Sequence, residues 1–252
     1  MDLSTLPVFS ALLDLTSTGL MALISLLTPA TGALAGALAG ALAVVLVTLL
    51  ARAALIPAGV AQAKAEQTRA RLAPRLRELQ KRHRGDRERL QRATMELYRA
   101  EGASPFAGCL PLLLQAPIVG LLYSVFLHPV IGGHANELLA QNLFGVPLDT
   151  SLVGAVRAGT ADPATWIVTG CLVLAIALVG ELTRRLFRPP KPEASDVSGI
   201  PAAPVGLLGV LQFATAFVAV FVPLAAGLYL LTTVTWTLVQ RLILRRRYPT
   251  PS

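Results

Sequence analysis

The chain has 252 residues, of which 54% are hydrophobic and only 14% are charged. A soluble domain carries roughly 25% charged residues, so the composition argues against an ordinary soluble fold. The formal charge of +8 would suit a nucleic-acid-binding protein, but the basic residues are not spread along the chain. Asp, Glu, Lys and Arg are missing from four long runs. Since a helix of roughly 20 apolar residues crosses a bilayer, these runs are candidate membrane spans. These runs are residues 16–51, 102–136, 163–180 and 197–240.

The first uncharged run is too long for one membrane span and is broken at Pro29. Within residues 1–30, leucines recur at helical spacing, which predicts a peripheral helix on the outer face of the membrane. The first span is predicted at residues 32–57. It opens with glycines four residues apart, a spacing that lets helices approach closely in lipid, although an alanine-rich composition explains it equally well. These glycines are Gly32, Gly36 and Gly40.

Residues 58–104 have the opposite character, because twelve Lys or Arg and six Asp or Glu fall within them. Their periodicity predicts two amphipathic helices, at residues 59–82 and 87–100, with Gly85 supplying the turn between them. We therefore expect an antiparallel helical hairpin that stands in water beside the membrane.

The rest of the chain alternates between apolar and polar segments. Pro223 lies near the middle of the last apolar run, which is about twice the length of one span, so we expect two helices there. The predicted order is a second span at 105–127, an extracytoplasmic loop at 128–163, a third span at 164–183, a cytoplasmic linker at 184–204, a fourth span at 205–221, a fifth span at 222–244 and a cytoplasmic tail at 245–252.

The distribution of basic residues predicts the orientation of this all-α, five-span architecture. The hairpin holds twelve of the 22 Lys and Arg residues, the linker four and the segment from Arg241 four, which leaves only Arg52 and Arg157. Basic residues collect on the cytoplasmic side of membrane proteins. We therefore predict a multi-pass protein with its N-terminus outside and its C-terminus in the cytoplasm, and the same asymmetry explains the positive charge without DNA as a partner.

Residues typical of catalytic or metal sites form no recognisable motif. Both cysteines, Cys109 and Cys171, lie within apolar runs, which argues against a disulfide framework or a metal site. The three histidines share no spacing pattern, and Glu181 lies three and four residues before two arginines, as in a helix-end ion pair. The sequence therefore predicts no enzyme, no cofactor and no metal.

Arg52 is the one basic residue with apolar neighbours on both sides within a predicted span. An arginine in a span costs about 2.5 to more than 10 kcal/mol, depending on its depth and its access to water. One interpretation is that its side chain snorkels to the interface, since Pro57 is about one turn away. The other is that Arg52 faces a water-filled cavity within the bundle. Thr48, one turn earlier in the same span, would line that cavity with it, together with polar residues of other spans: Gln115, Gln212, Thr232 and Thr233.

Three segments carry a resemblance to a known family. They read TLLARAALIP around Arg52, then MELYRAEGASPFAGCLPLLLQAPIVGLLY, and finally VPLAAGLYLLTTVTWTLVQRLIL at the last span. In these segments the chain resembles the YidC/Oxa/Alb insertases, strongly over residues 40–127 and moderately over residues 217–244. The match is in the short form of the family, as in bacteria with a single membrane. Leu230 departs from the family pattern, which often has a second aromatic residue after the tyrosine that corresponds to Tyr229.

The resemblance implies a five-helix core around a groove that opens to the cytoplasm and the lipid. Arg52 matches the arginine of that groove, Thr48 matches a polar position beside it, and Tyr229 joins the predicted lining. The family is thought to admit hydrophilic segments of nascent membrane proteins into the groove and to release the membrane-spanning segment to lipid along the third and fifth spans. The implied location is the bacterial plasma membrane, and the implied partners are nascent membrane proteins, lipid, the ribosome and the general secretion channel.

Two other functions stay open from the residues alone. A small transporter or channel would use Arg52 as an anion site, although transporters of this size usually contain internal repeats, which we do not find. A structural scaffold would bind a partner complex through the charged hairpin.

Overall fold

The computed structural model describes residues 18–19, 22, 25, 38–83, 85–104, 120–121, 123–128, 130–131, 134–136, 138–187 and 213–247. Within these ranges the protein is mostly helical. The helices are α2 (Ala39–Ala54), α3 (Ile56–Arg82), α4 (Arg87–Ala100), α6 (Leu152–Ala158), α7 (Pro163–Leu186), α9 (Ala214–Ala219) and α10 (Leu224–Arg247). Four short strands accompany them: β1 (Val130–Ile131), β2 (His134–Ala135), β3 (Asn142–Leu143) and β4 (Val146–Pro147).

Two of the described helices, α7 and α10, are each long and apolar enough to cross a membrane. The pair α2 and α3 meets the same criteria together, as one broken span, so the described residues contain two or three candidate spans. Most of the peripheral helix, most of the second span and the first half of the fourth span lie outside the described residues. The five-span count therefore stays a prediction, whereas the helical membrane character is confirmed.

The break between α2 and α3 falls at Leu55, where the two helix axes bend by 55°. Pro57 stands in the first turn of α3, a position that tolerates proline because the first amides of a helix have no partner within it. Without an amide hydrogen, Pro57 cannot donate to the carbonyl of Ala53, and α2 cannot continue straight into α3. The break at Leu55 lies two residues before the predicted end of the first span at residue 57.

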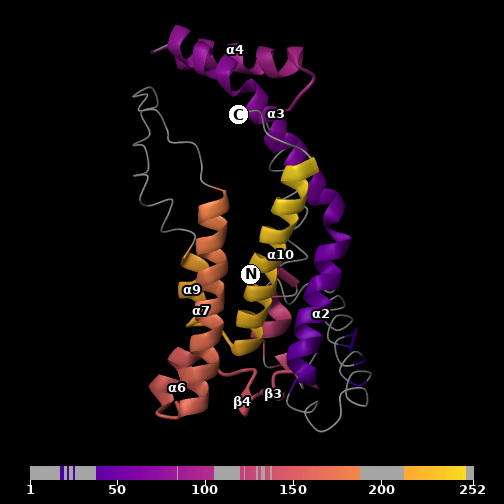
Figure 1. The fold of residues 1–252 in the computed structure, drawn as a ribbon, viewed down its shortest axis with the longest axis vertical. Helices are drawn as coiled ribbons and strands as arrows, with labels where there is room; N and C mark the ends of the chain where they lie inside the picture. The colour runs from indigo at the N-terminus through magenta and orange to yellow at the C-terminus, as the bar shows by residue number, and fades with distance from the viewer. Residues whose placement is uncertain are drawn as a thin grey trace.

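Helix α10 lies between α2 and α7 and packs against both (Figure 1). All three helices run in the same direction, so their C-terminal ends lie toward the same end of the molecule. Gly227 allows the close approach of α10 to α7, because a Cβ at that position would lie 2.5 Å from a methyl group of Leu172.

The segment expected to be a loop contains a tight β-hairpin. Strands β3 and β4 pair Leu143 with Val146, and the two residues between them, Phe144 and Gly145, have φ angles of 50° and 86°. Two consecutive residues with positive φ form a type I′ turn, the usual connection of a two-residue hairpin. Gly145 adopts this backbone without the steric cost that a side chain would add.

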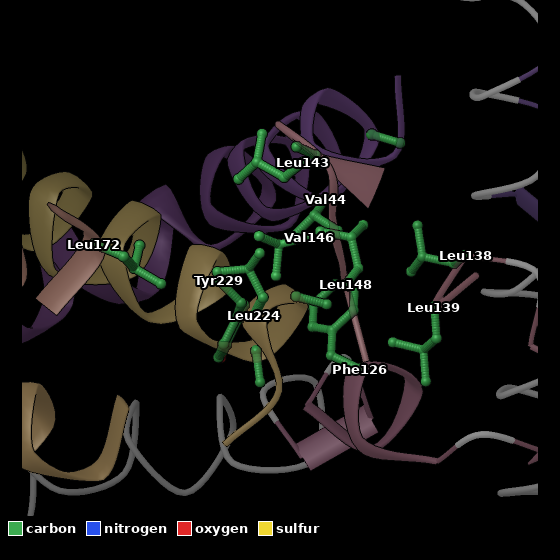
Figure 2. Packing of buried hydrophobic residues seen from close by; sticks show 14 of the residues in the cluster. Val44, Phe126, Leu138, Leu139, Leu143, Val146, Leu148, Leu172, Leu224 and Tyr229 are labelled. Carbon is green, nitrogen blue, oxygen red and sulfur yellow. The ribbon is translucent and has the colours of Figure 1, made fainter. Parts of the chain in front are cut away.

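The β3–β4 hairpin is part of the hydrophobic core. Leu143, Val146 and Leu148 are buried together with Val44 of α2 and Leu224 of α10. Figure 2 shows the hairpin side chains between the two helices. The segment at residues 138–148 therefore packs into the core with α2 and α10, rather than passing over the helices as a simple connection.

The residues that follow β4 accept hydrogen bonds from the first amides of α10. The first amides of a helix lack partners within it, and here Leu224 N donates to the Thr150 carbonyl and Ala225 N to the Leu148 carbonyl, both at 3.0 Å. Helix α10 begins directly after Pro223, so the helix boundary in the last apolar run falls at the expected proline.

Of the three glycines spaced four residues apart, the structure describes the surroundings of Gly40. A Cβ at Gly40 would lie 2.6 Å from the Cβ of Gln141 and 3.0 Å from a methyl group of Leu148. Among the described residues, this glycine therefore allows close contact with the residues that flank the β3–β4 hairpin, rather than with another span.

Helix α4 has the residues expected of the second helix of the charged segment, Arg87–Ala100. Asp86 caps it by accepting a hydrogen bond from Arg89 N at 3.0 Å. At its other end Glu101 forms ion pairs with Arg71 and Arg75 of α3. Because Glu101 follows α4 while the two arginines belong to the middle of α3, α4 turns back toward α3.

Helix α7 begins at a strong N-cap. Asp162 Oδ1 accepts hydrogen bonds from the hydroxyl and the backbone amide of Thr165, at 2.5 and 2.8 Å. These bonds stabilise the charged carboxylate and lower the pKa of Asp162 below its ordinary value.

Candidate functional site around Arg52

Thr48 and Arg52 lie one turn apart on α2, and Arg52 lies close to Tyr229 of α10. Thr48 is completely buried, and its hydroxyl donates to the Val44 carbonyl at 2.7 Å. Arg52 is half-buried in the last turn of α2, just before the break at Leu55. No carboxylate of the described residues lies within ion-pair distance of its guanidinium.

Helix α10 presents two hydroxyl groups to this arginine. The Tyr229 side chain is 2% exposed, and its hydroxyl lies within electrostatic range of the Arg52 guanidinium and the Thr233 hydroxyl. The Tyr229 and Thr233 hydroxyls are both buried, and neither makes a well-formed hydrogen bond to a described residue, although the Tyr229 hydroxyl lies close to Arg52 and Thr233. A buried hydroxyl left unpaired costs about 1–3 kcal/mol, so such groups are rare and call for a partner such as a bound water or a ligand.

An aromatic cluster surrounds the Tyr229 ring. The ring centroids of Tyr123 and Phe126 lie 6.2 and 5.7 Å from that of Tyr229, in tilted arrangements that aromatic pairs favour. Phe126 is fully buried, whereas Tyr123 is partly exposed. Tyr123 was not among the predicted site residues, although it ends the GLLY segment of the family motif.

The structure brings together three of the seven predicted site residues, Arg52, Tyr229 and Thr233, and Thr48 lies one turn before Arg52 on α2. Thr232 lies next to Thr233 but donates its hydroxyl to the Leu228 carbonyl of its own helix at 2.8 Å. Gln115 and Gln212 lie outside the described residues.

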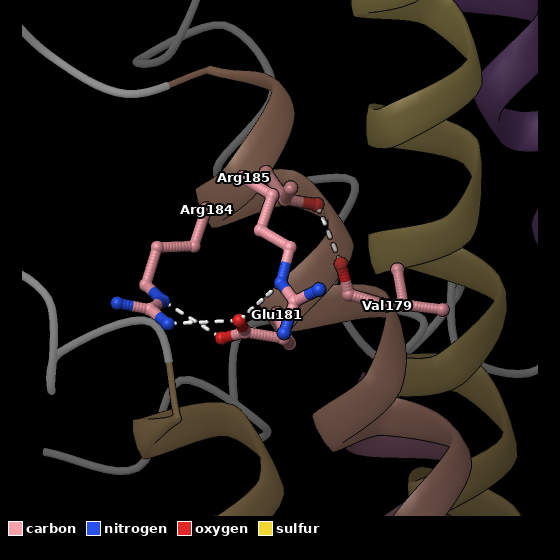
Figure 3. A network of polar contacts seen from close by, with 5 residues as sticks. Val179, Glu181, Arg184 and Arg185 are labelled. Carbon is pink, nitrogen blue, oxygen red and sulfur yellow. Dashed lines mark hydrogen bonds and ion pairs between the residues drawn. The ribbon is translucent and has the colours of Figure 1, made fainter.

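Elsewhere in the described part of the chain, the polar side chains have partners or lie apart from one another. Glu181 binds both arginines of the helix end, at 2.7 Å from Arg184 Nε and 2.6 Å from Arg185 Nε, so the predicted ion pair is confirmed (Figure 3). Among the described residues, no three His, Cys, Asp or Glu side chains come together as a metal site would require. Cys171 is a free, exposed thiol on α7.

Comparison with known proteins identifies the family. Residues 34–251 match the family model described as "60Kd inner membrane protein". The chain belongs to this family. The resemblance found in the sequence is thereby confirmed, and the protein is a bacterial membrane protein.

Several relatives carry the name "Membrane protein insertase YidC". The chain is 28% identical over 215 residues to that of Streptomyces avermitilis, which covers 81% of this chain and 50% of the relative. Identity is 46% over 82 residues with that of Xanthomonas campestris, or 32% of this chain and 14% of the relative. With that of Clostridium perfringens it is 39% over 79 residues, or 31% of this chain and 33% of the relative. The chain thus spans half or less of the length of these family members.

Proposed function

We propose that this family member is a membrane protein insertase. It admits hydrophilic segments of nascent membrane proteins into an intramembrane groove centred on Arg52 and then releases the membrane-spanning segment to lipid. The names of its relatives support the activity. The observation that supports the site is the half-buried Arg52, which has no carboxylate partner among the described residues and lies beside the hydroxyls of Tyr229 and Thr233.

The chemistry of this site suits an acidic substrate segment. A carboxylate entering it would accept from the guanidinium and from both hydroxyls, and a hydrogen bond to a charged group contributes about 1.5–3 kcal/mol. These contacts would offset part of the cost of moving a charge into the membrane. We propose that Thr48, one turn before Arg52, lines the groove together with Gln115, Gln212 and Thr232. No covalent bond is made or broken, so the proposed activity is not enzymatic.

The arrangement of the helix ends supports the proposed orientation. The C-terminal ends of α7 and α10 lie toward the same end of the molecule as α3 and α4, and these segments hold most of the basic residues (Figure 1). Arg157 lies on α6 at the opposite end. We propose that the basic end is cytoplasmic, where it would meet the ribosome and the general secretion channel.

Reconstitution tests the arginine mechanism. Liposomes containing the purified chain are supplied with a single-span substrate that has an acidic outer segment, and insertion is measured by protease protection. We expect Arg52→Ala to reduce insertion at least about tenfold, since one lost charge-assisted contact is worth about 1.5–3 kcal/mol, while Arg52→Lys retains most of it. Arg157→Ala is the matched control and should insert normally.

The substrate provides a second arm of this experiment. Replacing its acidic residues with their amides should remove the difference between wild type and Arg52→Ala. Normal insertion by Arg52→Ala would contradict the arginine mechanism and leave the family assignment intact. Anion flux through the liposomes without insertion would instead favour the transporter interpretation.

A further inference from the structure

Two arginines of α10 are held against one aromatic ring at the basic end of the molecule. The guanidinium carbon of Arg245 lies 5.3 Å from the centre of the Phe187 ring, and that of Arg241 lies 5.9 Å from it. Arg245 also donates from Nη1 to the Leu186 carbonyl at 3.1 Å. A cation over an aromatic face within about 6 Å is attracted by the ring, so both guanidinium groups are restrained.

This pair differs from the neighbouring arginines of α7. Arg184 and Arg185 share the carboxylate of Glu181 (Figure 3). Among the described residues, no carboxylate lies within ion-pair distance of Arg241 or Arg245. Two positive charges one helical turn apart repel each other. An anion bound between the two guanidinium groups would offset this repulsion, so their shared position over the Phe187 ring suits an anion site.

An exposed apolar row on α7 leads to the same place. Its leucines repeat every four residues, and side chains at this spacing follow one another along a helix. Their exposed fractions are 59% for Leu174, 60% for Leu178, 46% for Leu182 and 43% for Leu186. The row ends at Leu186, whose carbonyl accepts the Arg245 hydrogen bond. It is about 18 Å long at 1.5 Å per residue, close to one leaflet of a hydrocarbon core of about 30 Å.

We propose that Arg241 and Arg245 bind the phosphodiester of an anionic phospholipid whose acyl chain lies along the leucine row of α7. Guanidinium groups match phosphate oxygens through paired N–H donors, and basic sites between helix ends at the cytoplasmic side take anionic headgroups. Nucleic acid would use the charges but not the leucines, which lie immediately below them on a candidate span. The site does not depend on the insertase proposal.

Binding of defined lipids to the full-length protein tests the site. The protein in an uncharged detergent is titrated with dioleoylphosphatidylglycerol or dioleoylphosphatidylcholine, and bound lipid is counted by native mass spectrometry. We expect the wild type to bind phosphatidylglycerol at least about tenfold more tightly, because each arginine near an anionic headgroup contributes severalfold. The double variant Arg241→Gln/Arg245→Gln should lose this preference.

The matched control removes the same charge from the same helix. Arg246→Gln/Arg247→Gln should change phosphatidylglycerol affinity by less than about threefold, since neither residue contacts Phe187. Phe187→Leu keeps every charge, and we expect it to weaken binding about threefold by releasing the guanidinium groups. Unchanged thermal unfolding of each variant establishes that the effects do not come from misfolding.

Three results would overturn the proposal. Equal losses in the two double variants would show a diffuse surface charge instead of a site. Glycerol 3-phosphate that binds as tightly as phosphatidylglycerol would assign the site to free phosphate, because the acyl chain would then contribute nothing. A ribosomal RNA fragment that displaces phosphatidylglycerol and depends equally on Arg241 and Arg245 would assign it to nucleic acid.

Discussion

Gly59 at the base of α3 makes room for a side chain from α10. A Cβ at residue 59 would lie 1.6 Å from Gln240 Nε2 and 2.8 Å from Gln240 Cδ. The same Gln240 amide accepts a hydrogen bond from Trp236 Nε1 at 2.9 Å. Gly59→Ala must therefore displace the Gln240 side chain and break its bond with Trp236, which loosens the contact of α3 with α10.

The expected magnitude follows from two opposing terms. Loss of the hydrogen bond costs about 1 kcal/mol, while alanine in place of glycine within a helix gains about 0.5–1 kcal/mol. Gly59→Ala alone should therefore change the free energy of unfolding little. In the Gln240→Ala background the bond is already absent and the gain alone remains. The two substitutions should thus show a coupling free energy of about 1 kcal/mol.

Tryptophan fluorescence measures this directly, because the chain has two tryptophans and Trp166→Phe leaves Trp236 as the only reporter. We expect Gly59→Ala and Gln240→Ala each to shift the emission of Trp236, and the double variant to show no further shift. The free energy of unfolding in detergent gives the coupling. Unshifted emission in Gly59→Ala, or an equal effect of Gly59→Ala in both backgrounds, would refute the reasoning.

Three more predictions concern stability. Gly227→Ala should lower the free energy of unfolding by about 1–3 kcal/mol, because its Cβ meets a methyl group of Leu172 at 2.5 Å, whereas Gly170→Ala, with nothing within 4 Å, should not lower it. Asp162→Asn keeps a helix cap but loses the titrating carboxylate. Since the folded pKa of Asp162 is lowered, wild type should lose stability in thermal unfolding as the pH falls below the ordinary value of 3.8, and the variant should lose less. Glu101→Gln removes two mainly exposed ion pairs and should lower the free energy of unfolding by less than about 1 kcal/mol. The expected sign of this loss is faster amide hydrogen exchange in α4. Unchanged exchange would contradict the role of Glu101 in holding α4 to α3.

Features with local causes were predictable from the sequence. The bounds of α4 follow from charge periodicity and the Asp86 cap, and the start of α10 follows from Pro223, because caps and prolines act on their own helix. The Glu181 ion pair was predictable because side chains three and four residues apart on one helix meet.

The core role of the β3–β4 hairpin was not predictable in the same way. Its apolar residues are too few to show a period, and their burial depends on α2 and α10, which are distant in sequence. Gly145 was the only local signal, and a glycine alone indicates a turn without saying what the turn packs against. Tyr123 was missed for the same reason, because its place in the site comes from contact with Tyr229 across the bundle.

The arginines show why charge patterning alone identifies a topology but not a site. Arg184 and Arg52 both follow long apolar stretches, and from the sequence each could simply extend to the interface. The structure separates them by their partners. Arg184 has a carboxylate one turn away at 2.7 Å, whereas Arg52 lies beside two buried hydroxyls that make no well-formed hydrogen bond to a described residue. An arginine that only snorkels has no need of such hydroxyls beside it, and an acceptor that enters from outside would satisfy all three groups at once.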